Sequence, residues 1–154
     1  MRLSELLKPQ NIKLGLAART KIEAITELVT LLVSNGQIVD PEKVLATVLE
    51  REATRTTGIG NGVAIPHGKC AGLTDLAIAL GKCTTPVDFQ AIDGRPVTWI
   101  WLLTSPPDKP NPHIHALARI SKLMTMEKVR RDLLAAQTPE QVFEVIQQAE
   151  TTMG

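Results

Sequence analysis

The sequence predicts an α/β fold, a three-layer-like sandwich in which helices pack around a small mixed β-sheet. Two observations lead to this prediction. Apolar residues recur at helical spacing in several segments, and most of these segments open on a capping residue. Between them lie two short apolar runs of strand length, residues 76–80 and 97–103.

Two helices are predicted in the first third of the chain. Thr20 opens a Thr-x-x-Glu capping box, and the apolar stripe behind it ends at Gly36, a residue type that favours a helix C-terminus. Asp40 followed by Pro41 forms a second cap and first-turn pair, and an apolar face continues from there toward Arg51. We therefore expect two helices close together in sequence.

The middle of the chain combines a glycine-rich segment with two strands. Four glycines surround a proline in residues 57–68, which predicts a loop whose backbone approaches another group closely. The apolar runs at 76–80 and 97–103 are predicted to be buried strands. A Thr-Pro pair at 85–86 and an Asp-Gly pair at 93–94 predict turns between them.

Three helices are predicted in the last third. Asn111 and Pro112 open the first, after a proline-rich loop. A short helix follows at 127–136, and the last helix is capped by Thr138. The tail, residues 151–154, is predicted to fray.

Length and charge limit the class of protein. At 154 residues we expect a single domain spanning residues 1–154. The 17 basic residues nearly cancel the 16 acidic ones, so the chain lacks the basic surface of a nucleic-acid binder. Nucleic acid is therefore not expected as a partner.

We expect a cytoplasmic protein. Its two cysteines, Cys70 and Cys83, argue against a disulfide framework, and both are predicted to be small buried hydrophobes. Residues 1–10 lack the uninterrupted apolar run of a signal peptide. The longest strongly apolar stretch, 97–104, is far shorter than the roughly 20 residues that a membrane-spanning helix needs. At most, the protein is peripheral to a membrane permease.

The three histidines, His67, His113 and His115, lie in or beside segments that interrupt the regular pattern. His67 ends the glycine-rich segment, where backbone N–H groups can surround phosphate oxygens; alternatively, it fills a turn after Pro66. His113 lies in the first turn of a predicted helix, whose dipole attracts anions; alternatively, it is a surface residue. His115 points about 200 degrees away from His113 on a helical wheel.

Other kinds of site fit the pattern less well. The glycine-rich segment lacks the lysine and Ser/Thr of a P-loop and the spacing of a dinucleotide fingerprint, so no ATP, NAD or other cofactor is expected. No metal is expected either, because His113 and His115 do not share a helical face and no zinc-ligand spacing surrounds them. A Ser-His-Asp hydrolase is not supported, since Gly-x-Ser-x-Gly is absent.

Residues 57–69 read TGIGNGVAIPHGK. This segment closely resembles the active-site signature of the IIA components of the phosphoenolpyruvate sugar phosphotransferase system (PTS), fructose and mannitol type, that is, the PTS EIIA type-2 domain. It is also similar to the nitrogen-related IIA proteins of that superfamily. The resemblance covers nearly the whole chain, including Arg51, AIDGRPV at 91–97 and HIHALA at 113–118.

The resemblance implies roles for three residues. His67 would be the phosphoryl acceptor, through Nε2 as a tele-phosphohistidine, with His113 as the second active-site histidine and Arg51 as a phosphate-stabilising cation. Arg51 can also be interpreted as a solvated residue at a helix C-terminus; Arg55 could take either role, and Lys69 could add positive charge. An imidazole suits this chemistry because it is largely neutral at pH 7 and has a free lone pair.

The resemblance further implies a phosphotransferase component with two protein partners. An HPr-type phosphocarrier protein would load His67, and a IIB component on another chain would accept the phosphoryl group. The alternative is a regulatory binding module, in which phosphorylation of His67 changes docking to a target protein. The sequence predicts neither the sugar, nor the downstream acceptor, nor the oligomeric state.

Overall fold

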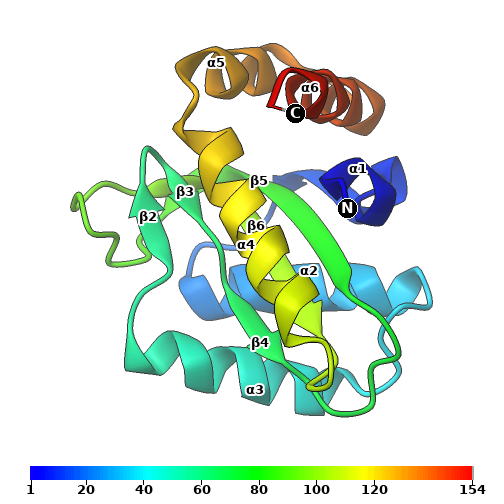
Figure 1. Cartoon of the computed structure of the whole chain (residues 1–154). Coiled ribbons are helices and arrows are strands. Elements are labelled where there is room, and N and C mark those ends of the chain that lie inside the picture. Colours follow the sequence, from blue (N-terminus) through cyan, green and yellow to red (C-terminus); the bar gives the residue numbers. More distant parts are fainter. Residues whose placement is uncertain (154) are drawn as a thin grey trace.

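The computed structural model describes residues 1–153, which form a mixed six-stranded sheet with six α-helices packed around it (Figure 1). The helices are α1 (Leu3–Leu6), α2 (Lys21–Ser34), α3 (Pro41–Thr54), α4 (Pro110–Thr125), α5 (Glu127–Ala135) and α6 (Pro139–Met153). The strands are β1 (Ile12–Leu16), β2 (Gly58–Gly60), β3 (Val63–Ala64), β4 (His67–Lys69), β5 (Ala77–Val87) and β6 (Val97–Ser105). A 3-10 helix, Pro9–Asn11, precedes β1.

Strand β6 is the centre of the sheet. The strand order is β1-β5-β6-β3-β2, and β4 also pairs with β6. On one side, β6 is antiparallel to β5, with Leu103 opposite Ile78. On the other side, β3 and β4 run parallel to β6, and His67 lies opposite Leu103. The glycine-rich segment is therefore held in place by a strand that comes about 35 residues later in the chain.

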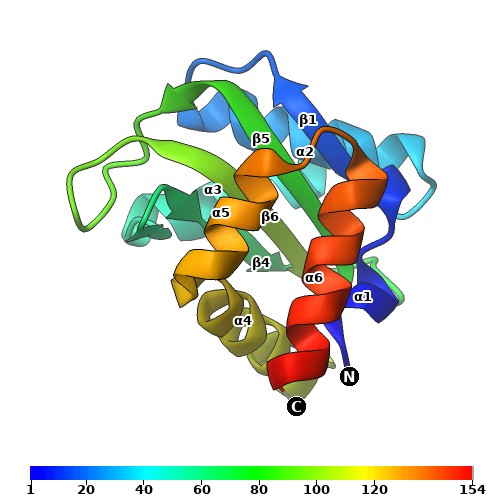
Figure 2. The same ribbon diagram turned by 90° about the horizontal axis from the view of Figure 1, so that it is seen from above.

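Helices cover both faces of the sheet, as Figure 2 shows from above. On one face, α2 and α3 pack on an apolar core that includes Leu28 and Leu102. On the other face, α1, α4, α5 and α6 pack on a second core that includes Trp101 and Ile120. Leu102 and Trp101 reach opposite cores because side chains alternate along a strand. The predicted α/β arrangement of a small mixed sheet between helices is confirmed.

The predicted starts of α2 and α3 are confirmed by their capping contacts. The Thr20 hydroxyl accepts a hydrogen bond from the Glu23 N–H at 3.2 Å, and the Glu23 carboxylate accepts one from the Arg19 N–H at 2.9 Å, which completes the capping box. The Asp40 carboxylate accepts from the Lys43 N–H at 3.2 Å. The helices predicted in the last third begin within one residue of their expected positions.

The prediction of a loop over residues 57–68 is wrong in part, because this segment contains β2, β3 and the first residues of β4. Such two- and three-residue strands carry little periodicity of their own and are defined by their pairing with β6. The turn between β2 and β3 does need glycine: Gly60, Asn61 and Gly62 have φ of 97°, 59° and 74°.

Strand β5 is longer than predicted. The run expected at 76–80 extends over Ala77–Val87, so the predicted turn at 85–86 is wrong. The register with β6 shifts between Lys82 and Val87, and Pro86 lies within that interval, where its missing N–H breaks no ladder hydrogen bond. The turn predicted at 93–94 is confirmed, since the Gly94 N–H donates to the Ala91 carbonyl at 2.9 Å.

The ends of the described chain also differ from the predictions. Residues 151–153 continue α6 and are not frayed, while Gly154 lies outside the described residues. Neither α1 nor β1 was predicted. The Glu150 carboxylate, fully buried on α6, accepts from the Leu3 N–H at 2.6 Å and from Arg119 Nε at 3.1 Å. It thus joins the first helix to α4 and α6.

Candidate functional site

His67 opens β4 and is half-buried. Its Nδ1 lies 2.8 Å from the carbonyl oxygen of Ile65, two residues earlier. A carbonyl oxygen can only accept, so Nδ1 carries the proton and donates. In the neutral ring this leaves the Nε2 lone pair free. The local backbone therefore selects the nitrogen that is available as a nucleophile or a ligand.

The surroundings of His67 favour the neutral ring. Burial lowers its pKa from the ordinary value, and the positive charge of Arg51 acts in the same direction. The hydrogen bond to Ile65 and the negative charge of Glu52 oppose this shift, but they do not reverse it. At neutral pH the Nε2 lone pair therefore needs no prior deprotonation.

Helix α4 brings His113 to His67. The two ring centroids lie 5.5 Å apart, with 60° between the ring planes. His113 is only 4% exposed, and its Nδ1 lies 2.6 Å from Ser105 Oγ. Burial, followed by the charges of His67 and Lys69, lowers the pKa of His113 to about 4. His113 is thus a neutral imidazole at physiological pH.

A pocket of about 300 Å³ opens beside His67. Arg51 and Arg55, at the end of α3, contribute to its wall. Arg51 Nη1 donates to the Arg55 carbonyl at 2.9 Å, so the guanidinium satisfies a carbonyl just beyond the helix and also faces the pocket. The expected place of Arg51 at a helix C-terminus is confirmed, and its role toward phosphate stays a prediction. Other residues that line the pocket are Thr56, Thr57, Gly58, Ile59, Ile65, Ile92, Leu117 and Ser121.

Some candidate residues lie outside this pocket. His113 packs against His67 but is not among the described residues that line the pocket. Lys69 and His115 are exposed and do not line it either. The structure therefore brings together His67, Arg51 and Arg55 around one hollow, with His113 buried next to the first of them.

Glu52 belongs to the site region but was not predicted from the sequence. It is 5% exposed, and its carboxylate accepts hydrogen bonds from the N–H of Thr57, at 2.9 Å, and from the Thr57 hydroxyl. It also pairs with Lys21 Nζ at 3.1 Å. Glu52 thereby anchors the start of the glycine-rich segment. The signal was present, because Glu52 continues the buried Val44 and Val48 stripe at helical spacing.

Ser105 was also missed. It is fully buried at the end of β6, and strand alternation places it on the same face as Trp101 and Leu103. These two residues belong to the core that packs against α4, so Ser105 faces the helix that carries His113. A polar residue at a core position of a strand was the available signal.

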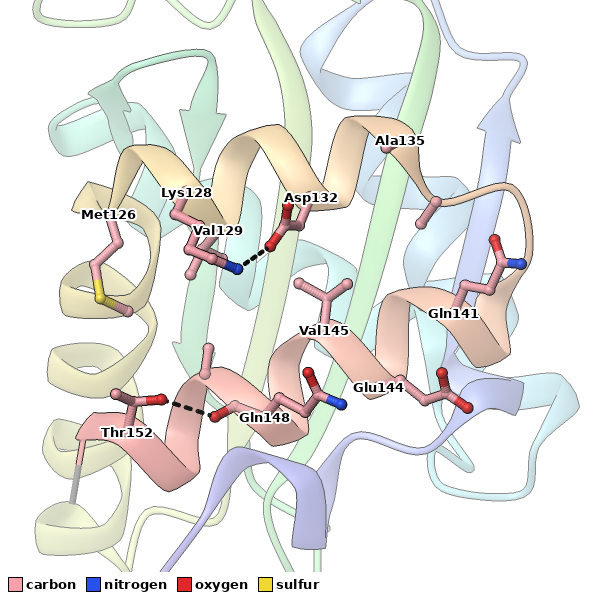
Figure 3. Close-up of a pocket in the computed structure, with 12 residues that line it drawn as sticks. Met126, Lys128, Val129, Asp132, Ala135, Gln141, Glu144, Val145, Gln148 and Thr152 are labelled. Atoms are coloured by element: carbon pink, nitrogen blue, oxygen red, sulfur yellow. Dashed lines mark hydrogen bonds and ion pairs between the residues drawn. The ribbon is translucent and has the colours of Figure 1, made fainter.

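A second hollow, of about 500 Å³, lies between α5 and α6 (Figure 3). Met126, Val129 and Val145 give it apolar walls, and Lys128 pairs with Asp132 at 2.7 Å along α5. It shares no lining residue with the pocket beside His67. None of the described residues that line it is a histidine, so it lacks the residue type on which the first pocket is centred.

The cysteines are buried, as predicted. Cys70 is fully buried and Cys83 is 4% exposed, and burial raises the pKa of each thiol to about 11. Neither thiol is therefore a reactive thiolate at neutral pH. Within residues 1–153, no group of three or more His, Cys, Asp or Glu residues could hold a metal ion. Over the same residues, no helix has both the length and the apolar character needed to cross a membrane.

An α/β sandwich with a neutral histidine beside an arginine-lined pocket has the features of a phosphocarrier domain. The chain belongs to the family of EIIA 2 components of the phosphoenolpyruvate-dependent sugar phosphotransferase system, whose family model matches residues 5–149. It is a phosphoryl-transfer component of that system, and the resemblance noted in the sequence is confirmed.

Curated relatives include both sugar-transport and regulatory proteins. The chain is 35% identical over 148 residues to the PTS system fructose-specific EIIABC component of Bacillus subtilis, covering 96% of this chain but only 23% of that protein. It is 33% identical over 153 residues to the nitrogen regulatory protein of Escherichia coli, covering 99% of this chain and 93% of that protein. Similarity alone does not separate the two roles.

Solved structures share the fold. The nitrogen regulatory protein IIA-Ntr from Neisseria meningitidis is 28% identical, with a TM-score of 0.87 over 94% of this chain and 98% of that chain. Enzyme IIA-Mtl in its complex with phosphorylated enzyme IIB-Mtl, from Escherichia coli, is 24% identical, with a TM-score of 0.78 over 92% of this chain and 97% of that chain. The second similarity concerns the fold alone.

Proposed function

We propose that His67 accepts a phosphoryl group through Nε2 from the phosphohistidine of an HPr-type carrier protein. The group then passes to a IIB-type acceptor or serves as a signal. The observation that carries this proposal is the 2.8 Å hydrogen bond between Nδ1 of His67 and the Ile65 carbonyl, which leaves Nε2 as the free nitrogen beside the pocket. Membership of the EIIA 2 family supports the reaction class.

The proposed step is a direct transfer between two imidazoles. Nε2 of His67 attacks the phosphorus, a new N–P bond forms, and the N–P bond to the carrier's histidine breaks, with the electron pair leaving on the carrier's ring. Positive charge develops on the ring of His67, and the Ile65 carbonyl stabilises the Nδ1–H that carries it. Phosphoryl transfer requires positioning and charge neutralisation more than acid or base catalysis.

The arginines and the second histidine supply these needs in the proposal. Arg51 and Arg55 line the pocket, so their charges lie where the phosphoryl oxygens would be received. His113, 5.5 Å from His67 between ring centroids, would donate a hydrogen bond to the phosphoryl group as a neutral ring. A neutral donor avoids adding a third positive charge close to His67.

Exposed apolar residues around the pocket support a transient docking face for the protein partners. Ile92, which lines the pocket, is 72% exposed, and Ile114, about one turn before the lining residue Leu117 on α4, is 60% exposed. Large apolar side chains in such positions favour association with another protein surface. We propose that the carrier and the acceptor use this face in turn, because both must reach Nε2 of His67.

A regulatory role is the second proposal. The similarity to nitrogen regulatory proteins favours it. A phosphoryl group would add about −1.5 to −2 charges beside Ile92 and Arg51, enough to change how this face docks to a target protein. In this case the modified and unmodified forms would differ mainly in affinity for a partner outside transport.

The test is intact mass after incubation with phosphoenolpyruvate, the general phosphotransferase enzyme and its histidine carrier. Wild type and His115→Ala, which removes an exposed histidine outside the pocket, should each gain one acid-labile phosphoryl group. His67→Ala should gain none, and His113→Ala should gain it or pass it on more slowly. Normal phosphorylation of His67→Ala would refute the proposal.

A second arm separates the two roles. Phosphorylated protein is mixed with IIB proteins, and loss of the phosphoryl group to one of them would support a place in transport. A phosphoryl group that no IIB protein removes, together with a phosphorylation-dependent affinity for another protein, would support the regulatory role.

A further inference from the structure

We infer that Ser105 is a positioning residue for His113. Its hydroxyl donates a hydrogen bond to Nδ1 of His113 and so holds the neutral ring in the tautomer that is protonated at Nε2. That Nε2–H is then the donor available to a phosphoryl group on His67. The inference rests on the proposed function of His67 and adds a residue to it.

The contact itself is short and enclosed. Ser105 Oγ lies 2.6 Å from His113 Nδ1, Ser105 is fully buried, and His113 is 4% exposed. Water competes little for the partners of a hydrogen bond that is shielded from solvent, and the low local dielectric strengthens the bond electrostatically. The ring of His113 is therefore fixed by a single protein partner on its Nδ1 side.

The direction of this hydrogen bond follows from the donors and acceptors present. A neutral imidazole has one N–H and one lone pair, whereas a hydroxyl can both donate and accept. Among the described residues, His113 Nδ1 is the one hydrogen-bond partner of the Ser105 hydroxyl. If Nδ1 donated, the buried O–H of Ser105 would have no acceptor, which costs free energy. The arrangement that satisfies both groups has Ser105 donating and the proton of His113 on Nε2.

The position of Ser105 is set by the sheet that also sets His67. Ser105 lies opposite Lys69 in the pairing of β6 with β4, and its carbonyl accepts from the Cys70 N–H at 2.7 Å. In the same pairing, His67 lies opposite Leu103, two residues before Ser105. The serine that orients the second histidine and the strand that carries the first are thus parts of one rigid ladder.

Two tautomers would have opposite effects on the proposed reaction. With the proton on Nε2, His113 offers a donor from the side of the ring remote from Ser105. With the proton on Nδ1, Nε2 would instead present a lone pair, which repels phosphoryl oxygens. Fixing the tautomer before the phosphoryl group arrives is preorganisation of a donor where negative charge accumulates.

The experiment records long-range 1H–15N spectra of the unphosphorylated protein with 15N-labelled histidine at pH 7. Wild-type His113 should be a single neutral tautomer, protonated at Nε2. Ser105→Ala should shift His113 toward a mixture of tautomers, and Ser105→Thr, which keeps a hydroxyl, should retain the wild-type pattern. Thr104→Val is the matched control, because it removes the neighbouring buried hydroxyl, which donates to the Ala77 carbonyl and not to a histidine.

Phosphoryl transfer from the carrier is then measured on the same variants. Loss of one well-placed donor should slow the transfer to Ser105→Ala by about five- to tenfold, with Thr104→Val close to wild type. A wild-type His113 protonated at Nδ1, or the same tautomer in Ser105→Ala as in wild type, would overturn the inference. So would unchanged transfer to Ser105→Ala.

The two proposals fail in different ways. If wild type accepted no phosphoryl group on His67, the proposed function would fail, while the spectra of the unmodified protein would still decide whether Ser105 sets the proton of His113. If wild type were phosphorylated normally and the spectra showed no dependence on Ser105, only the inference about Ser105 would fail.

Discussion

Replacing Glu52 by glutamine should lower the free energy of unfolding. The side chain of Glu52 is 3% exposed, and its carboxylate makes three contacts: an ion pair with Lys21 Nζ at 3.1 Å and hydrogen bonds from the N–H and the hydroxyl of Thr57. Glu52→Gln keeps the shape of the side chain and one acceptor oxygen. It removes the negative charge and replaces the second acceptor by an NH2 donor.

The expected cost follows from these contacts. Breaking a fully buried ion pair costs about 3–5 kcal/mol because the remaining charge is stranded. Lys21 is 18% exposed and also lies 3.4 Å from Gln90 Oε1, so it retains some solvation and the cost should fall below that range. The hydrogen bond from the Thr57 N–H becomes a neutral one, which is weaker by about 1 kcal/mol. Together we expect a loss of about 2–3 kcal/mol in the free energy of unfolding.

The assay is urea unfolding at pH 7, followed by circular dichroism. Glu50→Gln on the same helix is the control, because Glu50 is exposed and its replacement should change the unfolding free energy by less than about 0.5 kcal/mol. Lys21→Met and the double variant complete a cycle, in which we expect a coupling energy of about 1–2 kcal/mol. If Glu52→Gln were as stable as Glu50→Gln, Glu52 would not anchor the glycine-rich segment.

Three further predictions concern the surroundings of His67. The unfolded chain takes up a proton on His113 near pH 6.5, whereas in the folded protein its pKa is about 4, so stability should fall as pH drops through this interval by at most about 3 kcal/mol. Calorimetry between pH 7.5 and 4.5 should find that His113→Gln loses less stability than wild type over this range. His115→Gln should lose as much stability as wild type. Gly58→Ala should lower the unfolding free energy by about 1–3 kcal/mol, measured in urea, because the new Cβ would lie 2.8 Å from backbone and side-chain carbons of Ala91. Arg51→Met should slow phosphoryl acceptance at least about tenfold in single-turnover assays, and a rate equal to wild type would exclude Arg51 as a phosphate-stabilising cation.

The elements that carry their own local signals were predictable from the sequence. Thr20 and Asp40 cap α2 and α3 as expected, and the apolar runs form β5 and β6. The elements that were missed have no such signal. Strands β1 to β4 have five residues or fewer, and pairing with β5, with β6 or with one another defines them. Pairing between distant segments cannot be recognised from periodicity in one of them.

The residues of the candidate site likewise include some that could be predicted from the sequence and some that could not. The sequence singled out His67 and His113, and the structure brings their rings to 5.5 Å between centroids. Glu52 and Ser105 each stand at a core position of their own element, which the sequence shows, but the sequence does not show what each of them binds. Their importance comes from Thr57 and His113, partners that only the folded chain brings to them.

The most direct test of the proposed role of His67 is to identify the atom that bears the phosphoryl group. The protein is labelled with 15N-histidine, phosphorylated through the carrier, and studied by long-range 1H–15N correlation under mildly alkaline conditions, in which phosphohistidine survives. We predict a phosphorylated Nε2 on His67, with Nδ1 still protonated against the Ile65 carbonyl. A phosphoryl group on Nδ1 of His67, or on His113 or His115, would contradict it.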